Sequence, residues 1–321
     1  DKTRQEGSYR FIRNDAVSSQ DITEAGCDEA LRQCKEKPLV LAIQDSTELS
    51  YRHASVRDKL GPVGNGRSKC ARGFVVHTTL AVDGIGGVPI GIMDQVRWMR
   101  PNGAPTRDER KSRPYSEKES FKWQAACERM QLKLGEWENT VVVGDRESDI
   151  YELLAFCLRT KLRFVFRGSQ NRKLLDDKER LLARVASQPV LGRRTVVLGQ
   201  RGGQGSDNGQ HARPARAGSA VEVEYRACRV PLTIAIPDNP ETPESIEVGV
   251  VLVSEVGKDP TKPKDGLHWL LLTSESVDSM EAAERVIDIY ETRWVIEEYH
   301  KAYKSGCRVE EAQMQEADNL E

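Results

Sequence analysis

Residues 39–47 read LVLAIQDST, an apolar run of strand length that turns polar at Gln44 and Asp45. A continuous apolar run of this length is typical of a strand buried on both faces of a sheet. We expect the strand to end at 44–47, which places Asp45 at its carboxyl end, where open α/β sheets bind ligands. A plain role for Asp45 in capping the following turn fits the pattern equally well.

The same pattern recurs at residues 140–145, TVVVGD, where a second short apolar run ends in an acid, Asp145. A helix is predicted to follow over 148–159. If the two strands are parallel neighbours, both carboxylates lie at one edge of the sheet and can share cations. Asp149 competes with Asp145 for this position, but at the start of a helix it is better placed to interact with the helix dipole.

A third element is residues 290–304, YETRWVIEEYHKAYK. At about 100° per residue, a helix places Tyr290, Arg293, Glu297 and Lys304 within an arc of roughly 60°. A carboxylate beside two cations and a phenol suits a metal ion next to a phosphate, although a solvated face with spaced ion pairs looks similar. The opposite stripe is expected to face the core: Ile289, Val295, Ile296, Tyr299, Ala302 and Tyr303.

Charge is unevenly distributed along the 321 residues, whose formal net charge is −2. Residues 159–216 contain 14 Lys and Arg against 4 Asp and Glu, whereas residues 281–321 contain 5 against 11. A basic middle and an acidic end suggest a polyanion site beside a site that collects cations. No apolar run approaches the roughly 18 residues of a membrane span. Seven scattered cysteines without a CxxC pair fit a cytoplasmic protein with reduced thiols and argue against structural zinc.

The remaining segments predict further elements. A hairpin is expected over 74–92, with its turn at 83–87 (DGIGG), and a helix over 117–134. Residues 56–72 and 96–115 are predicted to be loops. Strands are expected at 194–200, 220–230, 232–236, 246–256 and 269–273. The glycine-rich segment 199–218 could close over a phosphate backbone or be a plain disordered hairpin tip.

Two Asp on adjacent strands and a Glu on a late helix form the acid layout of a two-metal phosphoryl-transfer site. The oxygen ligands are few, which leaves room for water and substrate oxygens and favours Mg²⁺. We therefore expect two Mg²⁺ ions, for which Mn²⁺ can substitute, held by Asp45, Asp145 and Glu297.

The motifs resemble those of the DDE transposases of the insertion-sequence-four group. Residues 290–304 contain the group's Tyr-(2)-Arg-(3)-Glu-(6)-Lys signature. The stretches LAIQDSTELSYRH (41–53), VVVGDRESDIYELL (141–154), WLLLTSE (269–275) and VIDIYETRW (286–294) also look like the group's motifs, in the same order. The resemblance covers nearly the whole chain.

The resemblance implies an α/β fold with a ribonuclease-H-like mixed sheet and flanking helices, interrupted by a β-rich insertion before the last catalytic helix. Residues 1–38 would be the remnant of an N-terminal DNA-recognition domain. The catalytic core would comprise 39–167 and 276–321, with the insertion and its basic clamp loop at 168–275. The first residue is Asp1 rather than Met and a C-terminal dimerisation region is missing, so a fragment is expected.

The resemblance also implies cut-and-paste DNA transposition: 3′-OH nicking, hairpin formation and resolution, and strand transfer into target DNA. Transposon-end DNA and target DNA would be the partners, bound by a homodimer in the synaptic complex, with no membrane involved. Asp45, Asp145 and Glu297 would be the metal ligands, Glu297 being preferred to Glu298 by the signature spacing. The implied DNA contacts are Tyr290, Arg293, Lys304, Trp269, Arg146, Arg167, Arg213 and Arg216.

Some features depart from the group's pattern. Ser169 stands where a Lys is expected, so that phosphate contact could be missing or supplied by Arg172 or Lys173. The end-recognition and dimerisation regions are nearly absent. Two alternatives follow: a ribonuclease-H-like nuclease that does not transpose, or a truncated, non-catalytic regulator that inhibits transposition by forming mixed complexes.

Overall fold

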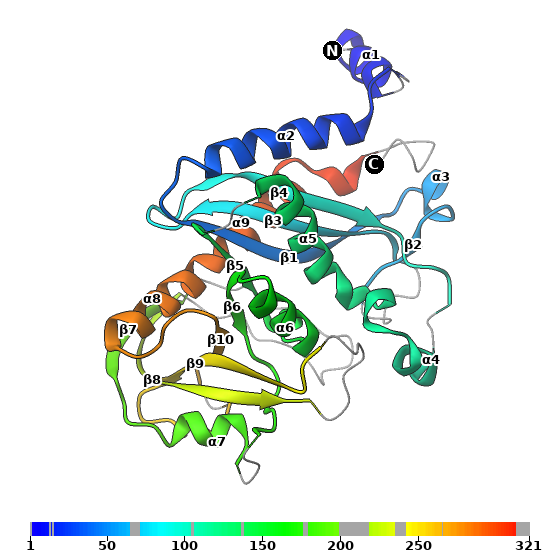
Figure 1. The fold of residues 1–321 in the computed structure, drawn as a ribbon. Coiled ribbons are helices and arrows are strands. Elements are labelled where there is room, and N and C mark those ends of the chain that lie inside the picture. The colour runs from blue at the N-terminus through cyan, green and yellow to red at the C-terminus, as the bar shows by residue number, and fades with distance from the viewer. Residues whose placement is uncertain are drawn as a thin grey trace. The chain divides into compact units, whose positions relative to one another are not determined.

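The computed structural model describes residues 2–12, 14, 16–64, 71–103, 106–135, 138–175, 179–198, 218–234, 242–264 and 266–312. The chain divides into two compact units (Figure 1). Unit 1 comprises Asp1–Phe164, Asp238–Thr242 and Ile289–Glu321, and unit 2 comprises Val165–Pro237 and Pro243–Asp288. The division falls within strand β6 (Arg163–Arg167) and within helix α8 (Met280–Glu291).

Unit 1 is built on a mixed sheet. Strands β1 (Val40–Tyr51), β3 (Arg72–Asp83) and β4 (Pro89–Trp98) pair antiparallel, and β5 (Thr140–Gly144) pairs parallel to β1. The two-residue strand β2 (Gly61–Pro62) pairs with the start of β3. The predicted hairpin turn forms because Asp83 Oδ1 accepts the amides of Ile85 and Gly86, and Gly87 adopts a φ of +65°.

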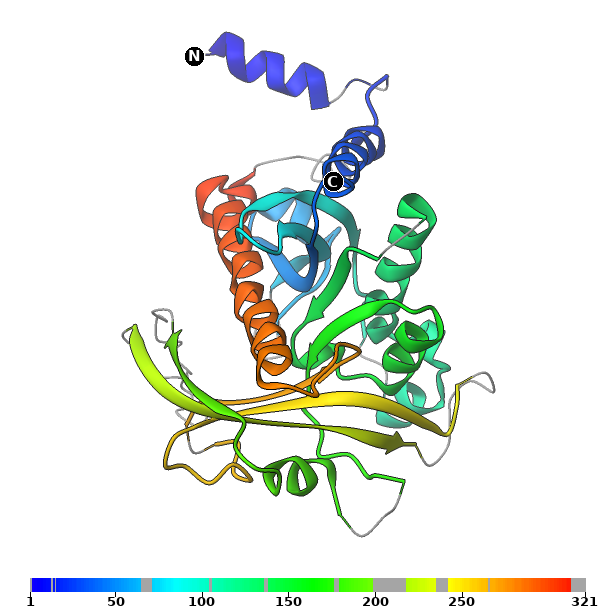
Figure 2. The same cartoon turned by 60° about the vertical axis from the view of Figure 1, so that its left-hand side comes forward.

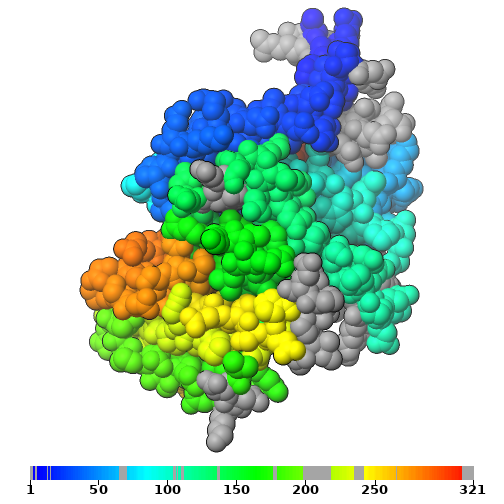
Figure 3. Space-filling model, viewed as in Figure 1, coloured from blue at the N-terminus to red at the C-terminus, as the bar shows by residue number. Residues whose placement is uncertain are grey.

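Helices flank both faces of this sheet (Figure 2). On one face lie α2 (Ser19–Cys34), α5 (Lys122–Leu134) and α6 (Tyr151–Arg159). Helix α2 approaches β4 so closely that a Cβ at Gly91 would lie 2.8 Å from Ala30 Cβ. The side chains of α2 and α5 cover the sheet in the space-filling view (Figure 3). Helix α9 (Val295–Lys301) contacts β1 from the other face.

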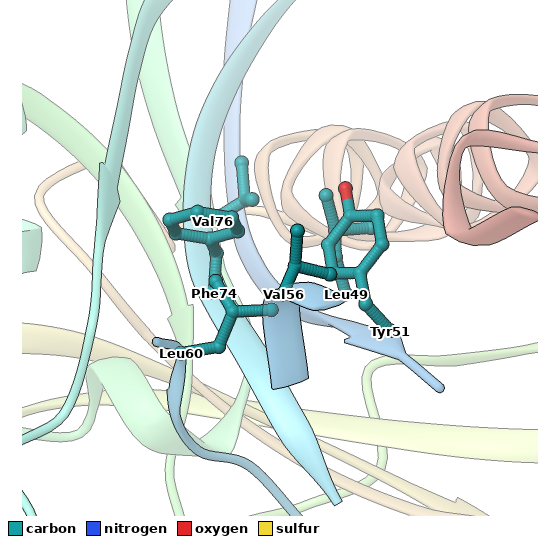
Figure 4. Close-up of a cluster of buried hydrophobic side chains, with 6 residues drawn as sticks. All are labelled: Leu49, Tyr51, Val56, Leu60, Phe74 and Val76. Atoms are coloured by element: carbon teal, nitrogen blue, oxygen red, sulfur yellow. The ribbon is translucent and has the colours of Figure 1, made fainter. Parts of the chain in front are cut away.

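A hydrophobic cluster holds the second part of β1 to the segment after α9 (Figure 4). Tyr51 meets Phe74 edge to face, with ring centroids 6.0 Å apart. Ser50 N donates to Glu310 Oε1 at 2.7 Å, which ties the same strand to the turn at Val309–Glu311. The buried members of the cluster are Leu49, Tyr51, Val56, Leu60, Phe74 and Val76, and Tyr303, Val309 and Ala312 pack against them.

Unit 2 is an antiparallel sheet in the order β6-β10-β9-β8-β7, formed with residues of β6 from Val165 onward. Its strands are β7 (Gly192–Leu198), β8 (Ser219–Thr233), β9 (Ser245–Glu255) and β10 (His268–Thr273), and α7 (Leu181–Ala186) packs on β8 and β9. The strand expected at 220–230 and the start of the one expected at 232–236 form the single strand β8, which ends at Thr233. Pro231 does not interrupt the strand, since it pairs with Glu247 of β9, and residues 235–236 lie outside the described residues.

The predicted α/β class, with a mixed sheet and flanking helices, is confirmed, and the order β4-β3-β1-β5 is consistent with a ribonuclease-H-like core. Two predicted loops are wrong in part. Residues 56–72 contain β2, and Val56 and Leu60 are buried. Strand β4 extends to Trp98, and α4 (Arg107–Ser112) begins with a capping box at Thr106.

The remaining helices are α1 (Lys2–Ile12) and α3 (Ala54–Arg57). Within the described part of the chain, no helix is both long enough and apolar enough to cross a membrane.

Candidate active site

Asp45 and Asp145 leave neighbouring parallel strands at matching positions. The register of β1 and β5 runs from Val40 with Thr140 to Ile43 with Val143, so each Asp lies two residues beyond the last pair. The two strands are parallel neighbours, which is the condition under which the sequence brings the two acids to one edge. The register therefore brings both carboxylates to the same place, where β5 stops.

The expectation that the first strand ends at 44–47 is wrong. β1 continues to Tyr51 because β3 pairs with it over its whole length, as far as Tyr51 with Arg72. Asp45 consequently lies inside a strand and caps no turn, and its Oδ1 accepts the amide of Ser46 at 2.8 Å. Asp145 is the residue that caps a turn: its Oδ1 accepts the amide of Glu147 at 2.8 Å.

Glu297 lies on a helical segment that is continuous but irregular. Helix α8 leads into a 3₁₀ turn (Thr292–Trp294), then α9, then a π-helical turn (Ala302–Gly306). A 3₁₀ turn winds more tightly than an α-helix and a π turn less tightly. The two turns therefore rotate the side chains away from the regular helical spacing in opposite directions. The expected stripes survive only in part: Tyr290 is 4% exposed, and Ala302, expected in the core, is exposed.

Arg293 connects the acids of this site. It forms an ion pair with Glu297, and its Nη1 lies 3.8 Å from Asp45 Oδ2. Its guanidinium carbon is 6.0 Å from the centroid of the Tyr290 ring. The Arg293 side chain is only 14% exposed and that of Asp45 21%, so solvent screens their interaction little. Glu297 is 60% exposed, and its pair with Arg293 is screened more.

The negative charges of two other acids act on Asp45. The pKa of its carboxyl is raised to about 7, mainly by burial and then by the charge of Asp145. Glu297 acts in the same direction, whereas Arg293 and the bond from the Ser46 amide lower the pKa. Asp45 is thus a buried acid whose ionised form is opposed by two other carboxylates, a situation that a bound cation would relieve.

His300, to which the sequence assigns no role, adjoins the same acid. Its Nδ1 lies 3.8 Å from Asp45 Oδ2, and its Nε2 is buried without a hydrogen-bond partner among the described residues. Burial lowers the pKa of His300 to about 4, and the positive charges of Lys304 and Arg293 add to this effect. The sequence spacing could have indicated this position, because His300 follows Glu297 by three residues and residues three apart lie on the same side of a helix.

The donor set fits a divalent cation by its chemistry. Three carboxylates supply only oxygen ligands, and the negative charges of Asp145 and Glu297 add to the burial that raises the pKa of Asp45. Among the residues that the structure describes, no three Asp, Glu, His or Cys side chains are gathered into a ready-made metal site. In this arrangement Arg293 supplies the positive charge that the acids share.

The competing acids are placed differently. Glu298 is exposed, and its carboxylate lies 3.7 Å from Lys301 Nζ. Asp149 is buried in front of α6, and it is Asp145 whose charge acts on Asp45.

The other predicted site residues that the structure describes belong to both units. Lys304 lines a cavity in unit 1, and Arg146 is exposed in the turn after β5. In unit 2, Arg167 Nη2 donates to the carbonyl of His268 at 2.9 Å, and Trp269 on β10 is buried. Arg213 and Arg216 lie outside the described residues.

A solved structure titled as a synaptic complex of the piggyBac transposase with hairpin DNA is similar at a TM-score of 0.38 and 12% identity. The match covers 86% of this chain and 42% of that one, so the chain spans less than half the length of that protein. Residues 111–321 match the family model described as a transposase DDE domain. This match contains Asp145 and Glu297, and Asp45 precedes it. Since the matched part is well over half of the sequence, the chain belongs to the family of DDE-domain transposases.

Proposed function

We propose that this chain is the catalytic core of a cut-and-paste DNA transposase of the insertion-sequence-four group, closely resembling the transposase of bacterial transposon five. The family match supports a transposase. One observation carries the assignment of the site: the buried carboxyl of Asp45 is under the negative charge of both Asp145 and Glu297, which come from separate elements. A largely buried acid whose ionisation is opposed by two other acids suits a site that operates with cations bound.

Asp45, Asp145 and Glu297 would hold two Mg²⁺ ions, with Mn²⁺ as a substitute. When bound, this pair of ions supplies a nucleophile of lowered pKa and stabilises the leaving oxygen. The chain's own contribution is rigidity. Asp45 is held within a strand and by the Ser46 amide, and Asp145 is held by the Glu147 amide, so two of the three acids keep their positions before the reaction.

The reaction sequence we propose begins with hydrolysis at the transposon end, which frees a 3′-OH. That hydroxyl attacks the opposite strand to form a hairpin, which a second hydrolysis opens. The regenerated 3′-OH then attacks target DNA. Each step exchanges one phosphodiester oxygen for another at the same site, so one set of acids is sufficient for all of them.

Arg293 would change partners during this sequence. It pairs with Glu297 and lies near Asp45, so it neutralises acids that a metal would otherwise neutralise. Its planar guanidinium also suits two oxygens of a phosphate. We assign it, with Tyr290 and Lys304, to the terminal phosphates.

The remaining DNA contacts rest on the resemblance. We assign Arg146, Arg167, Arg213 and Arg216 to backbone phosphates and Trp269 to stacking on an unstacked base. Transposon-end and target DNA are the proposed partners, in a homodimeric synaptic complex in the bacterial cytoplasm.

The test compares two adjacent glutamates. Glu297→Ala should reduce Mg²⁺-dependent nicking of a duplex carrying the terminal repeats of the chain's own element by about 10³-fold or more, because it removes a metal ligand worth several kcal/mol. Binding of that duplex in EDTA should persist. Glu298→Ala is the matched control, and it should nick like the wild type, since Glu298 faces Lys301.

Retained nicking by Glu297→Ala would refute the proposed site. Nicking by the wild type without any hairpin product would instead favour a ribonuclease-H-like nuclease. Absence of nicking, together with inhibition of an active full-length transposase, would favour the regulator.

A further inference from the structure

A cavity of about 480 Å³ lies in unit 1, and the three acids are not among the residues that line it. Its lining includes Ser46, which follows Asp45, and Glu147, which lies two residues after Asp145. Ser46, Thr47 and Ser50 are among the residues that line it. The volume lies in the range of small-ligand sites and suits one or two nucleotides.

The cavity exists because β1 is longer than β5. Residues 44–51 of β1 pair with β3 on one side, but the β5 register stops at Ile43, so no strand in the described part of the chain pairs with the other edge of β1 there. The amides of Ser46 and Ser50 point to this edge, where they donate to Asp45 Oδ1 and Glu310 Oε1. By the alternation of a strand, the amide of Glu48 points to the same side. An open strand edge offers hydrogen-bond donors to a ligand.

Lys122, the first residue of α5, supplies the cavity with a positioned cation. Its Nζ lies 5.9 Å from the ring centroid of Trp98 and 5.8 Å from that of Trp123. The side chain is only 11% exposed, so the two indoles hold its stem in one place. Its carboxylate partner, Glu147 at 3.3 Å, is itself 65% exposed and can give way to another anion.

Arg100, a second cation that lines the cavity, is held in ion pairs within the protein. Arg100 donates from Nε and Nη2 to both oxygens of Glu119, at 2.8 and 2.7 Å, and also pairs with Glu48. A guanidinium held by two carboxylates has few donors left for a ligand. An ammonium has three donors, and Glu147 is a single carboxylate partner, so Lys122 is the better anion-binding group.

The cavity also connects the two faces of the sheet. Lys304, from the segment after α9, lines it from one face, and Lys122 lines it from the face covered by α5. A polymer with regularly spaced negative charges can contact both ammonium groups while one of its phosphodiesters lies at the acids.

We propose that this cavity binds a segment of DNA strand, with Lys122 contacting the phosphate of a nucleotide beside the reacting phosphodiester. The inference rests on the proposed function for the identity of the polymer. It adds a binding site on the α5 side of the acids, where neither the signature residues nor the family match assigns a contact.

The test measures binding separately from chemistry. Affinity for a labelled single-stranded oligothymidylate is measured by fluorescence anisotropy in EDTA over a series of salt concentrations. Lys122→Met keeps the apolar stem between the indoles and removes the charge. We expect about tenfold weaker binding and a log–log salt slope smaller by about 0.7, the value for one phosphate contact on a single strand.

Lys133→Met is the matched control, because Lys133 is on the same helix and also lies 3.3 Å from a carboxylate, that of Asp28, but does not line the cavity. It should bind like the wild type. Glu147→Gln should bind more tightly, since it removes the anion that competes for Lys122. Melting temperatures close to that of the wild type would show that all three variants fold.

Unchanged affinity and salt slope in Lys122→Met would overturn the proposal. If affinity falls, two reactions identify the strand. Slower nicking of transposon ends assigns the cavity to the transposon strand, and slower transfer of pre-cut ends into a plasmid assigns it to target DNA. A loss of affinity that leaves both reactions unchanged would also overturn it. Failure of the proposed chemistry appears separately, as nicking that survives Glu297→Ala.

Discussion

The two parts of β1 have the same backbone conformation and opposite roles. Val40, Leu41, Ala42 and Ile43 are completely buried between β3 and β5, and all four are apolar. Among the described strands, residues 44–51 pair with β3 alone, and they contain all of the strand's polar side chains, including Asp45. The strand is therefore wholly apolar where it has two neighbours. Where it has one, it carries Asp45 and other polar residues as well as the buried Leu49 and Tyr51.

The difference between the two parts shows how the fold creates a reactive position. The short β5 ends while β1 continues, so the acid that follows β5 and the acid within β1 meet at an open edge. The buried first part supplies the stability that holds the second part in place. Carboxylates that repel one another are tolerated there because the rest of the strand is anchored.

The strongest test of this contrast is Asp45→Asn. Nicking should fall by about 10³-fold or more, because a metal ligand loses its charge. The metal-free protein should melt a few degrees higher at pH 8, since the ionised Asp45 is opposed by burial and by Asp145. Mg²⁺-dependent nicking and thermal unfolding in EDTA measure the two effects. A lower melting temperature would mean that the charge of Asp45 is needed by Arg293.

The next largest effect is expected in the buried part. Leu41→Ala should lower the free energy of unfolding by about 2–5 kcal/mol, because Leu41 is completely buried and a cavity would remain. Thr47→Ala, in the second part of the strand, should cost less than about 1 kcal/mol. Urea unfolding of both variants gives the comparison. Equal costs would contradict the division of β1 into a core part and a site part.

Local pattern was enough to predict the strands that are apolar along their whole length. β5 has the predicted bounds, 140–144, because an apolar run bounded by polar residues determines both of its ends. The end of β1 was not predictable in this way. Beyond Ile43 its residues are largely polar, and what keeps them in a strand is pairing with β3, which is about 30 residues away in sequence.

The candidate site shows the same limit. The parallel pairing of β1 and β5 followed from the two apolar runs, so the convergence of Asp45 and Asp145 could be predicted. The burial of Tyr290 could not, because a 3₁₀ turn at Thr292–Trp294 interrupts the regular helix that the spacing argument assumed. His300 and Lys122 were missed because their importance comes from partners that are distant in sequence, Asp45 and Trp98.

The smallest effect concerns His77, which faces the second part of β1. Its Nδ1 is 2.9 Å from Ser46 Oγ, and its Nε2 is 3.3 Å from Gln44 Oε1. Burial lowers the pKa of His77 to about 3 from the usual 6.5. The unfolded chain takes up a proton below pH 6.5, whereas the folded chain does not until about pH 3. The contribution of His77 to stability is therefore present above pH 6.5 and is lost as the pH falls, by about 2 kcal/mol at pH 5.

His77→Gln should remove this dependence. Asp45 and His300 titrate in the same range, so the quantity to compare is the difference in unfolding free energy between variant and wild type at each pH. We expect this difference to move by about 2 kcal/mol in favour of the variant between pH 7 and pH 5. If the difference in unfolding free energy between His77→Gln and the wild type did not change with pH, the folded protein would accept a proton on His77. Water would then reach β3 from the open edge of β1.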